Sequence, residues 1–203
     1  MQYIIALLIG YLLGCSNMAW YLAKLKGVDL AANGSGNPGT SNAVILMGWK
    51  LGILVGVHDI GKAILAVVLS KLIFPDISGI GEVAGVACVI GHIFPAFLKF
   101  KGGKGFASFV GMSFALDWKF ALAIVVVIAL VTLIFDYIVV GTTVTVIALP
   151  IYRLFTYPGW VSALIIAVAS VLILIVHRKN FVRIFKGTEI GLRSAFKGEH
   201  RKK

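Results

Sequence analysis

The sequence predicts an all-α integral membrane protein with about seven transmembrane helices, an external N-terminus and a cytosolic C-terminus. Of its 203 residues, 60% are apolar. Only 13% are charged, against roughly 25% in a typical soluble domain. The apolar residues fall into runs of membrane-spanning length, and the lysines and arginines gather between and after these runs. These observations together predict a chain embedded in lipid.

The apolar runs define the expected helices, because a membrane-spanning helix needs about 20 predominantly apolar residues. We expect spans at about 2–24, 50–74, 79–98, 106–117, 119–136, 138–156 and 159–177. The fourth run is short, so we expect a shortened helix, an extension into the preceding loop or a re-entrant piece there. The first run lacks a charged leading region and a convincing cleavage site, which favours a retained span over a secretory signal.

The distribution of basic residues predicts how the chain lies in the membrane. With seven spans, the loops near 24–50 and 99–105 share one side with residues 178–203, and these segments carry most of the lysines and arginines. Cytosolic loops are enriched in these residues. We therefore expect one transmembrane domain over residues 1–203, with residues 178–203 as a basic cytosolic tail. The net charge of +11 is explained by orientation and lipid contact, so we expect no nucleic-acid partner.

The first motif with chemical potential is the polar, glycine-rich segment Asn33–Asn42. Its glycines permit unusual backbone angles and its side chains supply hydrogen-bond donors, a combination that can wrap an anion. It matches the dinucleotide-binding fingerprint literally, but a membrane span precedes it where that fingerprint requires a strand. A flexible linker is the other alternative, and we favour an oxyanion-binding loop. Its candidate residues are Ser35, Gly36, Asn37, Ser41 and Asn42.

The second motif runs from Gly91 to Ser108 and contains the segment KGGKG at 101–105. It is not an ATP-binding P-loop, because Leu98 and Gly105 stand where that motif needs Gly and Ser or Thr. Glycines on both sides of Lys104 let backbone N–H groups and an ammonium group converge on a phosphate. The alternative interpretation makes the lysines simple membrane anchors. Its candidate residues are His92, Gly102, Gly103, Lys104 and Gly105.

The third motif spans residues 177–189. If the last span continues as a helix, His177, Asn180 and Arg183 share one face and form a polar stripe where the helix leaves the membrane. The alternative for His177 is a cap at the interface. Glu189 could orient a basic side chain, bind a polyol hydroxyl, or remain a solvated tail charge.

Ionisable residues also occur within the predicted second span, where they are costly unless paired or functional. Asp59 and Lys62 are three residues apart, which favours a structural ion pair over direct catalysis. Cys15 and Cys88 lie in apolar runs and are interpreted as packing residues. The sequence contains neither metal-ligand spacing nor a Gly-x-Ser-x-Gly elbow, so we expect no metal, no cofactor and no covalent nucleophile.

Together the three motifs resemble the acyl-phosphate-dependent glycerol-3-phosphate acyltransferases of bacteria, the PlsY family. The resemblance covers the whole chain and is most specific in the stretch GHIFPAFLKFKGGKGFAS at 91–108. The Asp-x-x-Lys spacing of Asp59 and Lys62 also fits the family. One departure is Ile45, which stands where the family often carries Arg.

The resemblance implies a bacterial inner-membrane enzyme that acts at the cytosolic face, with acyl phosphate, glycerol 3-phosphate and membrane lipids as partners. It implies transfer of the acyl group to the 1-hydroxyl of glycerol 3-phosphate, which gives lysophosphatidic acid. The implied catalytic residues are Ser35, Lys104 and His177. The implied substrate-binding residues are Gly36, Asn37, Ser41, Asn42, His92, Gly102, Gly103, Gly105, Asn180, Arg183 and Glu189. A transporter of phosphorylated compounds and a non-catalytic membrane scaffold remain the alternatives.

Overall fold

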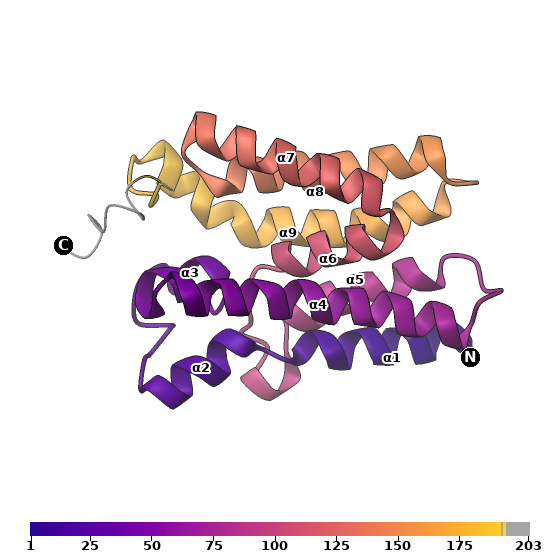
Figure 1. The fold of residues 1–203 in the computed structure, drawn as a ribbon, viewed down its shortest axis with the longest axis horizontal. Coiled ribbons are helices and arrows are strands. Elements are labelled where there is room, and N and C mark those ends of the chain that lie inside the picture. The colour runs from indigo at the N-terminus through magenta and orange to yellow at the C-terminus, as the bar shows by residue number, and fades with distance from the viewer. Residues whose placement is uncertain (192, 194–203) are drawn as a thin grey trace. The chain divides into compact units, whose positions relative to one another are not determined.

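The computed structural model describes residues 1–191 and 193 (Figure 1). All regular secondary structure in this part of the chain is helical. It divides into two compact units, Met1–Trp118 and the segment from Lys119 onward. Unit 1 contains α1 (Gln2–Cys15), α2 (Met18–Lys26), α3 (Thr40–Met47), α4 (Trp49–Ile73), α5 (Ile80–Ile93), the short 3-10 helix η1 (Ala96–Leu98) and α6 (Phe106–Leu116). Unit 2 contains α7 (Trp118–Phe135), α8 (Ile138–Thr156) and α9 (Val161–Phe185).

The helices have the length and composition of membrane spans. Within the described residues, six helical segments are long and apolar enough to cross a bilayer, and they are Gln2–Lys26, Trp49–Ile73, Ile80–Leu98, Trp118–Phe135, Ile138–Thr156 and Val161–Phe185. Phe106–Leu116 is apolar but shorter, as predicted for the fourth run. Large apolar side chains such as Leu12, Ile53 and Leu130 are exposed, which suits contact with lipid tails. The all-α membrane fold is thus confirmed.

The predicted first span is interrupted, which corrects the single helix expected over residues 2–24. Helix α1 ends at Cys15, Ser16 is extended, and α2 begins at Met18. The Oδ1 atom of Asn17 accepts a hydrogen bond from the backbone N–H of Trp20 at 2.8 Å, so Asn17 caps a new helix. Figure 1 shows α2 leaving the direction of α1 at this point.

Two further boundaries differ from the expected spans. Helix α3 begins at Thr40, inside the first glycine-rich motif, in a stretch for which we expected no helix. Helix α9 continues past the expected end at residue 177 as far as Phe185. His177, Asn180 and Arg183 therefore lie on one continuous helix, as the third motif required.

Helices α1 and α5 pack closely through small residues. A Cβ atom added at Gly10 would overlap the carbonyl oxygen of Ala84, and one added at Gly14 would overlap that of Cys88. On the facing helix, a Cβ at Gly91 would overlap the carbonyl oxygen of Tyr11. Contacts of backbone against backbone are typical of membrane helices that associate through small residues. They fix the position of the end of α5, from which the second motif emerges.

This packing predicts that Gly14→Val lowers the stability of the protein. The new side chain meets backbone atoms that cannot rotate away, and overpacking of this kind costs about 1–3 kcal/mol. Gly61→Val is the matched control, because Gly61 lies within α4 and a Cβ there meets nothing within 4 Å. Thermal unfolding in detergent should show a lower midpoint for Gly14→Val alone. Equal midpoints for the two variants would contradict the close α1–α5 packing.

Candidate active site

The first glycine-rich loop is organised by the side chain of Asn42, which is 0% exposed. Its Oδ1 atom accepts a hydrogen bond from the backbone N–H of Ser35 at 2.7 Å. Its Nδ2 atom donates to the carbonyl oxygens of Leu30 at 3.0 Å and Asn33 at 3.3 Å. Gly34 has a φ of +62°, and a Cβ there would overlap Asn42 Oδ1. Asn42, predicted as a substrate-binding residue, therefore uses its amide to hold the loop in shape.

The remaining loop residues lie nearer the surface. Ser35 and Asn37 are half-buried, and Gly36 and Ser41 are exposed. The loop is also tied to the break between α1 and α2, because Asn17 Nδ2 donates to the carbonyl oxygen of Pro38 at 3.2 Å. The loop is thus held by Asn17 and Asn42, whereas the side chains of Ser35, Asn37 and Ser41 are at least partly exposed.

The second glycine-rich loop folds back on the end of α5. The backbone N–H of Gly102 donates to the carbonyl oxygen of Ile93, and that of Gly103 donates to the carbonyl oxygen of His92, both at 3.0 Å. These bonds satisfy carbonyl groups that the end of a helix leaves without partners. The expected role for the Gly102 and Gly103 amides was phosphate binding, and the structure gives them this different role.

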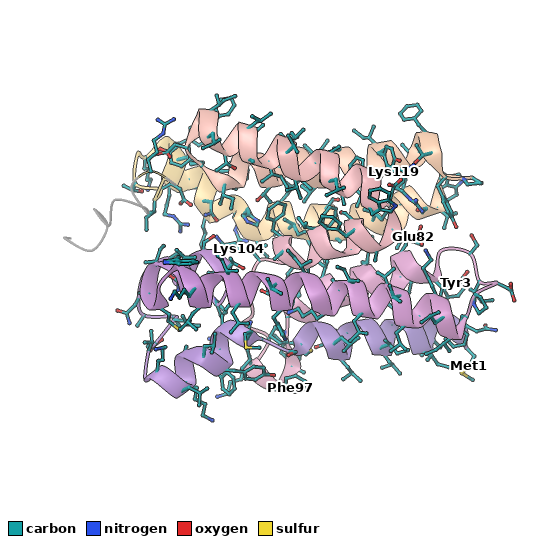
Figure 2. The ribbon with its side chains drawn as sticks, in the orientation of Figure 1. Met1, Tyr3, Glu82, Phe97, Lys104 and Lys119 are labelled. Atoms are coloured by element: carbon teal, nitrogen blue, oxygen red, sulfur yellow. The ribbon has the colours of Figure 1, made fainter. Side chains whose placement is uncertain are left out.

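Lys104 follows these glycines directly and is half-buried. Gly105 is the N-cap of α6, so Lys104 precedes a helix N-terminus, where partial positive charge accumulates. Figure 2 shows Lys104 toward the end of unit 1 that carries α3, whereas Met1, Tyr3 and Glu82 lie at the other end. A lysine and a helix N-terminus at this place are suited to binding an anion.

The close approach of the second loop to His92 predicts that Gly103→Ala impairs activity. A Cβ at Gly103 would overlap the His92 imidazole ring, so the loop that carries Lys104 must shift. We expect Lys104 to act in catalysis, and misplacement of a catalytic group by about 1 Å can cost about 100-fold in rate. We expect kcat/KM to fall by about that factor, while Gly61→Ala leaves it unchanged. A fully active Gly103→Ala variant would show that the loop position is not critical.

In unit 2, α9 carries the polar stripe of the third motif. His177 is buried, and its Nδ1 atom lies 2.8 Å from the carbonyl oxygen of Ile173. Because a carbonyl oxygen only accepts hydrogen bonds, Nδ1 carries the hydrogen and Nε2 bears the lone pair in the neutral ring. His177 can therefore accept a hydrogen bond or a proton through Nε2.

Glu189 holds the other two members of this stripe. Its carboxylate accepts hydrogen bonds from Asn180 Nδ2 through Oε1 and from Arg183 Nε through Oε2. The chain turns back after α9 to allow this, with the backbone N–H groups of Thr188 and Glu189 both donating to the carbonyl oxygen of Arg183. Of the three roles considered for Glu189, the structure supports the orientation of a basic side chain.

The predicted basic tail begins as the last part of α9 and continues into this turn. Farther on, the backbone N–H of Arg193 donates to Asp136 Oδ1 at 2.8 Å, which ties the segment after Glu189 to the end of α7. The rest of the predicted tail, residue 192 and residues 194–203, lies outside the described residues.

The ion pair predicted between Asp59 and Lys62 is present, with Lys62 Nζ 2.8 Å from Asp59 Oδ1. His92 belongs to the same cluster, since its Nδ1 atom lies 2.8 Å from Lys62 Nζ. His92 was predicted to bind substrate, and here it faces buried charges of its own unit. Its place beside Lys62 was not predicted, and the only sequence signal was an ionisable residue within an apolar run.

In the part of the chain that the structure describes, no cluster of His, Cys, Asp and Glu could hold a metal ion.

The fold and these sites define a multi-pass membrane protein whose polar groups gather in glycine-rich loops and on one helix face. A family model described as "Glycerol-3-phosphate acyltransferase" matches residues 4–187. The chain therefore belongs to the glycerol-3-phosphate acyltransferase family of PlsY type and is a membrane enzyme of phospholipid synthesis. This confirms the resemblance drawn from the three motifs.

The alignments with individual relatives cover nearly the full chain. A glycerol-3-phosphate acyltransferase of Oceanobacillus iheyensis is 36% identical, over 97% of this chain and 98% of its own length. A relative from Coxiella burnetii is 34% identical, over 93% and 97%. Among solved structures, the integral membrane glycerol 3-phosphate acyltransferase PlsY in its glycerol 3-phosphate form is 30% identical, with a TM-score of 0.89, covering 96% of this chain and 97% of that one. Its lysophosphatidic acid form gives a TM-score of 0.85 over 94% and 95%.

Proposed function

We propose that this enzyme transfers a fatty acyl group from acyl phosphate to the 1-hydroxyl of sn-glycerol 3-phosphate, producing lysophosphatidic acid and inorganic phosphate. The observation that carries this proposal is the full-length likeness to PlsY, solved in a glycerol 3-phosphate form and a lysophosphatidic acid form. We place the reaction at the cytosolic face of a bacterial inner membrane, because the segments that carry the motifs are also the basic ones. Both units would act as one transmembrane domain.

In this proposal the two loops of unit 1 bind the donor. Ser35, Gly36 and Asn37 supply polar groups from a loop that Asn42 holds in shape, with Ser41 at its exposed edge. Lys104 neutralises the phosphate, aided by the N-terminus of α6 that begins at Gly105. Gly102 and Gly103 contribute by fixing the loop on the end of α5, and His92 contributes by supporting it.

The polar stripe of unit 2 binds the acceptor. Arg183 contacts the phosphate of glycerol 3-phosphate and Asn180 contacts a hydroxyl group, both oriented by the Glu189 carboxylate. A guanidinium group matches phosphate geometry well. Ile45 stands where the family often has Arg, so Lys104, Arg178 or Arg183 supplies the positive charge that this position lacks.

The chemistry requires no covalent enzyme intermediate, because phosphate is a good leaving group. The glycerol O1 atom forms a bond to the acyl carbon, the bond from that carbon to the phosphate oxygen breaks, and phosphate leaves with the electron pair. The hydroxyl proton passes to His177 Nε2 or to a substrate phosphate. Catalysis then depends on aligning the reactants and stabilising the developing charge with Ser35 and Lys104.

The donor assignment is tested by incubating detergent-purified protein with labelled glycerol 3-phosphate and either palmitoyl phosphate or palmitoyl-coenzyme A. We expect labelled lysophosphatidic acid with palmitoyl phosphate alone. Formation with the thioester alone would reject acyl phosphate as the donor. Absence of product with both donors would reject acyl transfer from acyl phosphate as the reaction of this enzyme.

A further inference from the structure

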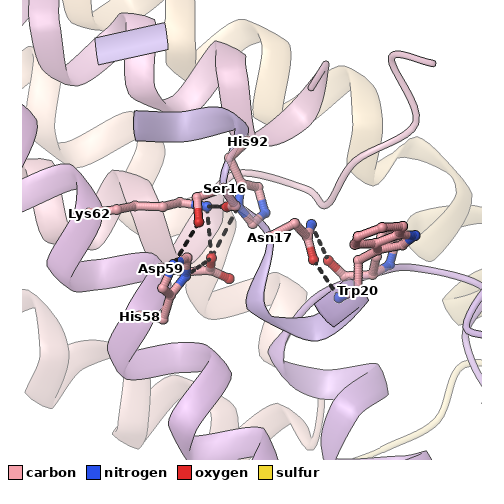
Figure 3. Close-up of polar contacts among 8 residues, drawn as sticks. Ser16, Asn17, Trp20, His58, Asp59, Lys62 and His92 are labelled. Carbon is pink, nitrogen blue, oxygen red and sulfur yellow. Dashed lines mark hydrogen bonds and ion pairs between the residues drawn. The ribbon is translucent and has the colours of Figure 1, made fainter. Parts of the chain in front are cut away.

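A buried group of charged and polar side chains lies next to the glycine-rich loops, and among its members only His92 was assigned to substrate binding. Its centre is Lys62, which is 6% exposed and lies next to Asp59 at 2% and His92 at 3%. His58 extends the group, with its Nε2 atom 3.0 Å from Ser16 Oγ. Figure 3 shows these side chains meeting at the break between α1 and α2.

The ammonium group of Lys62 has three hydrogens to donate and three partners within reach. It lies 2.7 Å from the carbonyl oxygen of Ser16, 2.8 Å from Asp59 Oδ1 and 2.8 Å from His92 Nδ1. These partners come from the break after α1, from α4 and from α5. A single buried cation thus joins the helix break to α4 and α5.

The helix break explains why a cation is needed there. Ser16 is extended, so carbonyl groups near it lose the partners that a continuous helix would supply. Within a membrane, backbone polar groups require an internal partner. Lys62 provides one, while Asp59 compensates the positive charge.

Each glycine-rich loop is attached to this cluster through one more contact. Asn17, the neighbour of Ser16, donates to the carbonyl oxygen of Pro38 in the first loop. The carbonyl oxygen of His92 accepts from Gly103 in the second loop, whose backbone lies against the His92 ring. A displacement of the cluster would therefore move both loops.

We propose that Lys62 is a positioning residue for acyl transfer, which sets both glycine-rich loops by joining the Ser16–Asn17 break to α4 and α5. The inference rests on the proposed function, in which these loops bind the donor phosphate. Loss of Lys62 should therefore weaken donor binding specifically. The acceptor residues belong to unit 2, so the KM for glycerol 3-phosphate should change little.

The test separates positioning from folding by comparing Lys62→Met with the double variant Asp59→Asn/Lys62→Met. Lys62→Met leaves the Asp59 carboxylate buried without its main partner and should lower the thermal midpoint. The double variant removes both charges and should regain most of that stability, since apolar or neutral replacement of a buried ion pair is often tolerated. It still lacks the donor to the Ser16 carbonyl. Lys71→Met is the control, because Lys71 is an exposed lysine on the same helix.

In the folded double variant, we expect the KM for palmitoyl phosphate to rise at least about tenfold and the KM for glycerol 3-phosphate to stay within about twofold. A normal donor KM, or a fall in kcat alone, would overturn the positioning role and leave Lys62 a stabilising residue. Failure of the wild-type protein to make lysophosphatidic acid would instead reject the proposed function.

A second measurement applies if the double variant has no measurable activity. Cys15 ends α1 at the break and Cys88 lies in α5, and both are buried. Loosening of the break should increase the rate of Cys15 modification by N-ethylmaleimide at least about tenfold relative to the Lys71→Met control. An unchanged Cys15 rate would overturn the proposal.

Discussion

Lys104→Ala is expected to lower kcat for acyl transfer by about 100- to 1,000-fold, because removing one stabilising donor from a transition state has an effect of this size. Lys104 lies between two glycines immediately before α6. In the proposed mechanism its ammonium group and the helix N-terminus act on the same anion. No other lysine in the second motif has this setting. The rate should be measured with purified protein and palmitoyl phosphate.

Lys101→Ala is the matched control, since Lys101 is an exposed lysine of the same loop. It should retain nearly full activity, and both variants should keep the wild-type thermal midpoint. Comparable turnover by a folded Lys104→Ala variant would remove this lysine from the catalytic scheme.

Glu189→Gln is expected to raise the KM for glycerol 3-phosphate by about 10- to 100-fold, with little change in the KM for acyl phosphate. Gln still accepts one hydrogen bond through its oxygen, but it lacks the charge that pairs with Arg183 and the second acceptor oxygen. Asn180 and Arg183 would then lose their fixed orientation. A charge-assisted contact of this kind is among the stronger hydrogen bonds.

The control for Glu189→Gln is Asp76→Asn, a similar change at an exposed acidic residue between α4 and α5. It should leave both KM values unchanged. If Glu189→Gln altered the donor KM as strongly as the acceptor KM, the assignment of Asn180 and Arg183 to glycerol 3-phosphate would be wrong.

Much of the fold could be predicted from hydropathy, because lipid requires long apolar helices. The second predicted span, 50–74, differs from Trp49–Ile73 by a single residue at each end. The break at Ser16–Asn17 was missed, since two polar residues between apolar runs barely change a hydropathy average. The capping preference of Asn17 was the available signal. Helix α9 extends to Phe185, beyond the membrane span predicted at 159–177, because its polar last turns are held by its own backbone and by the Glu189 contacts.

The site was predictable where residues are close in sequence. The Asp59–Lys62 pair and the helical face of His177, Asn180 and Arg183 followed from spacing alone. Long-range contacts were not predictable. The partnership of His92 with Lys62 and the engagement of Gly102 and Gly103 by the end of α5 depend on how α4, α5 and the helix break pack together.

The central claim is that the enzyme aligns two substrates for direct transfer and forms no covalent acyl-enzyme. Its most direct test is the intact mass of purified protein incubated with palmitoyl phosphate in the absence of glycerol 3-phosphate, followed by a chase with the acceptor. Direct transfer predicts an unmodified protein before the chase and rapid lysophosphatidic acid formation after it. A palmitoylated protein that loses its acyl group to glycerol 3-phosphate at the rate of turnover would contradict the claim.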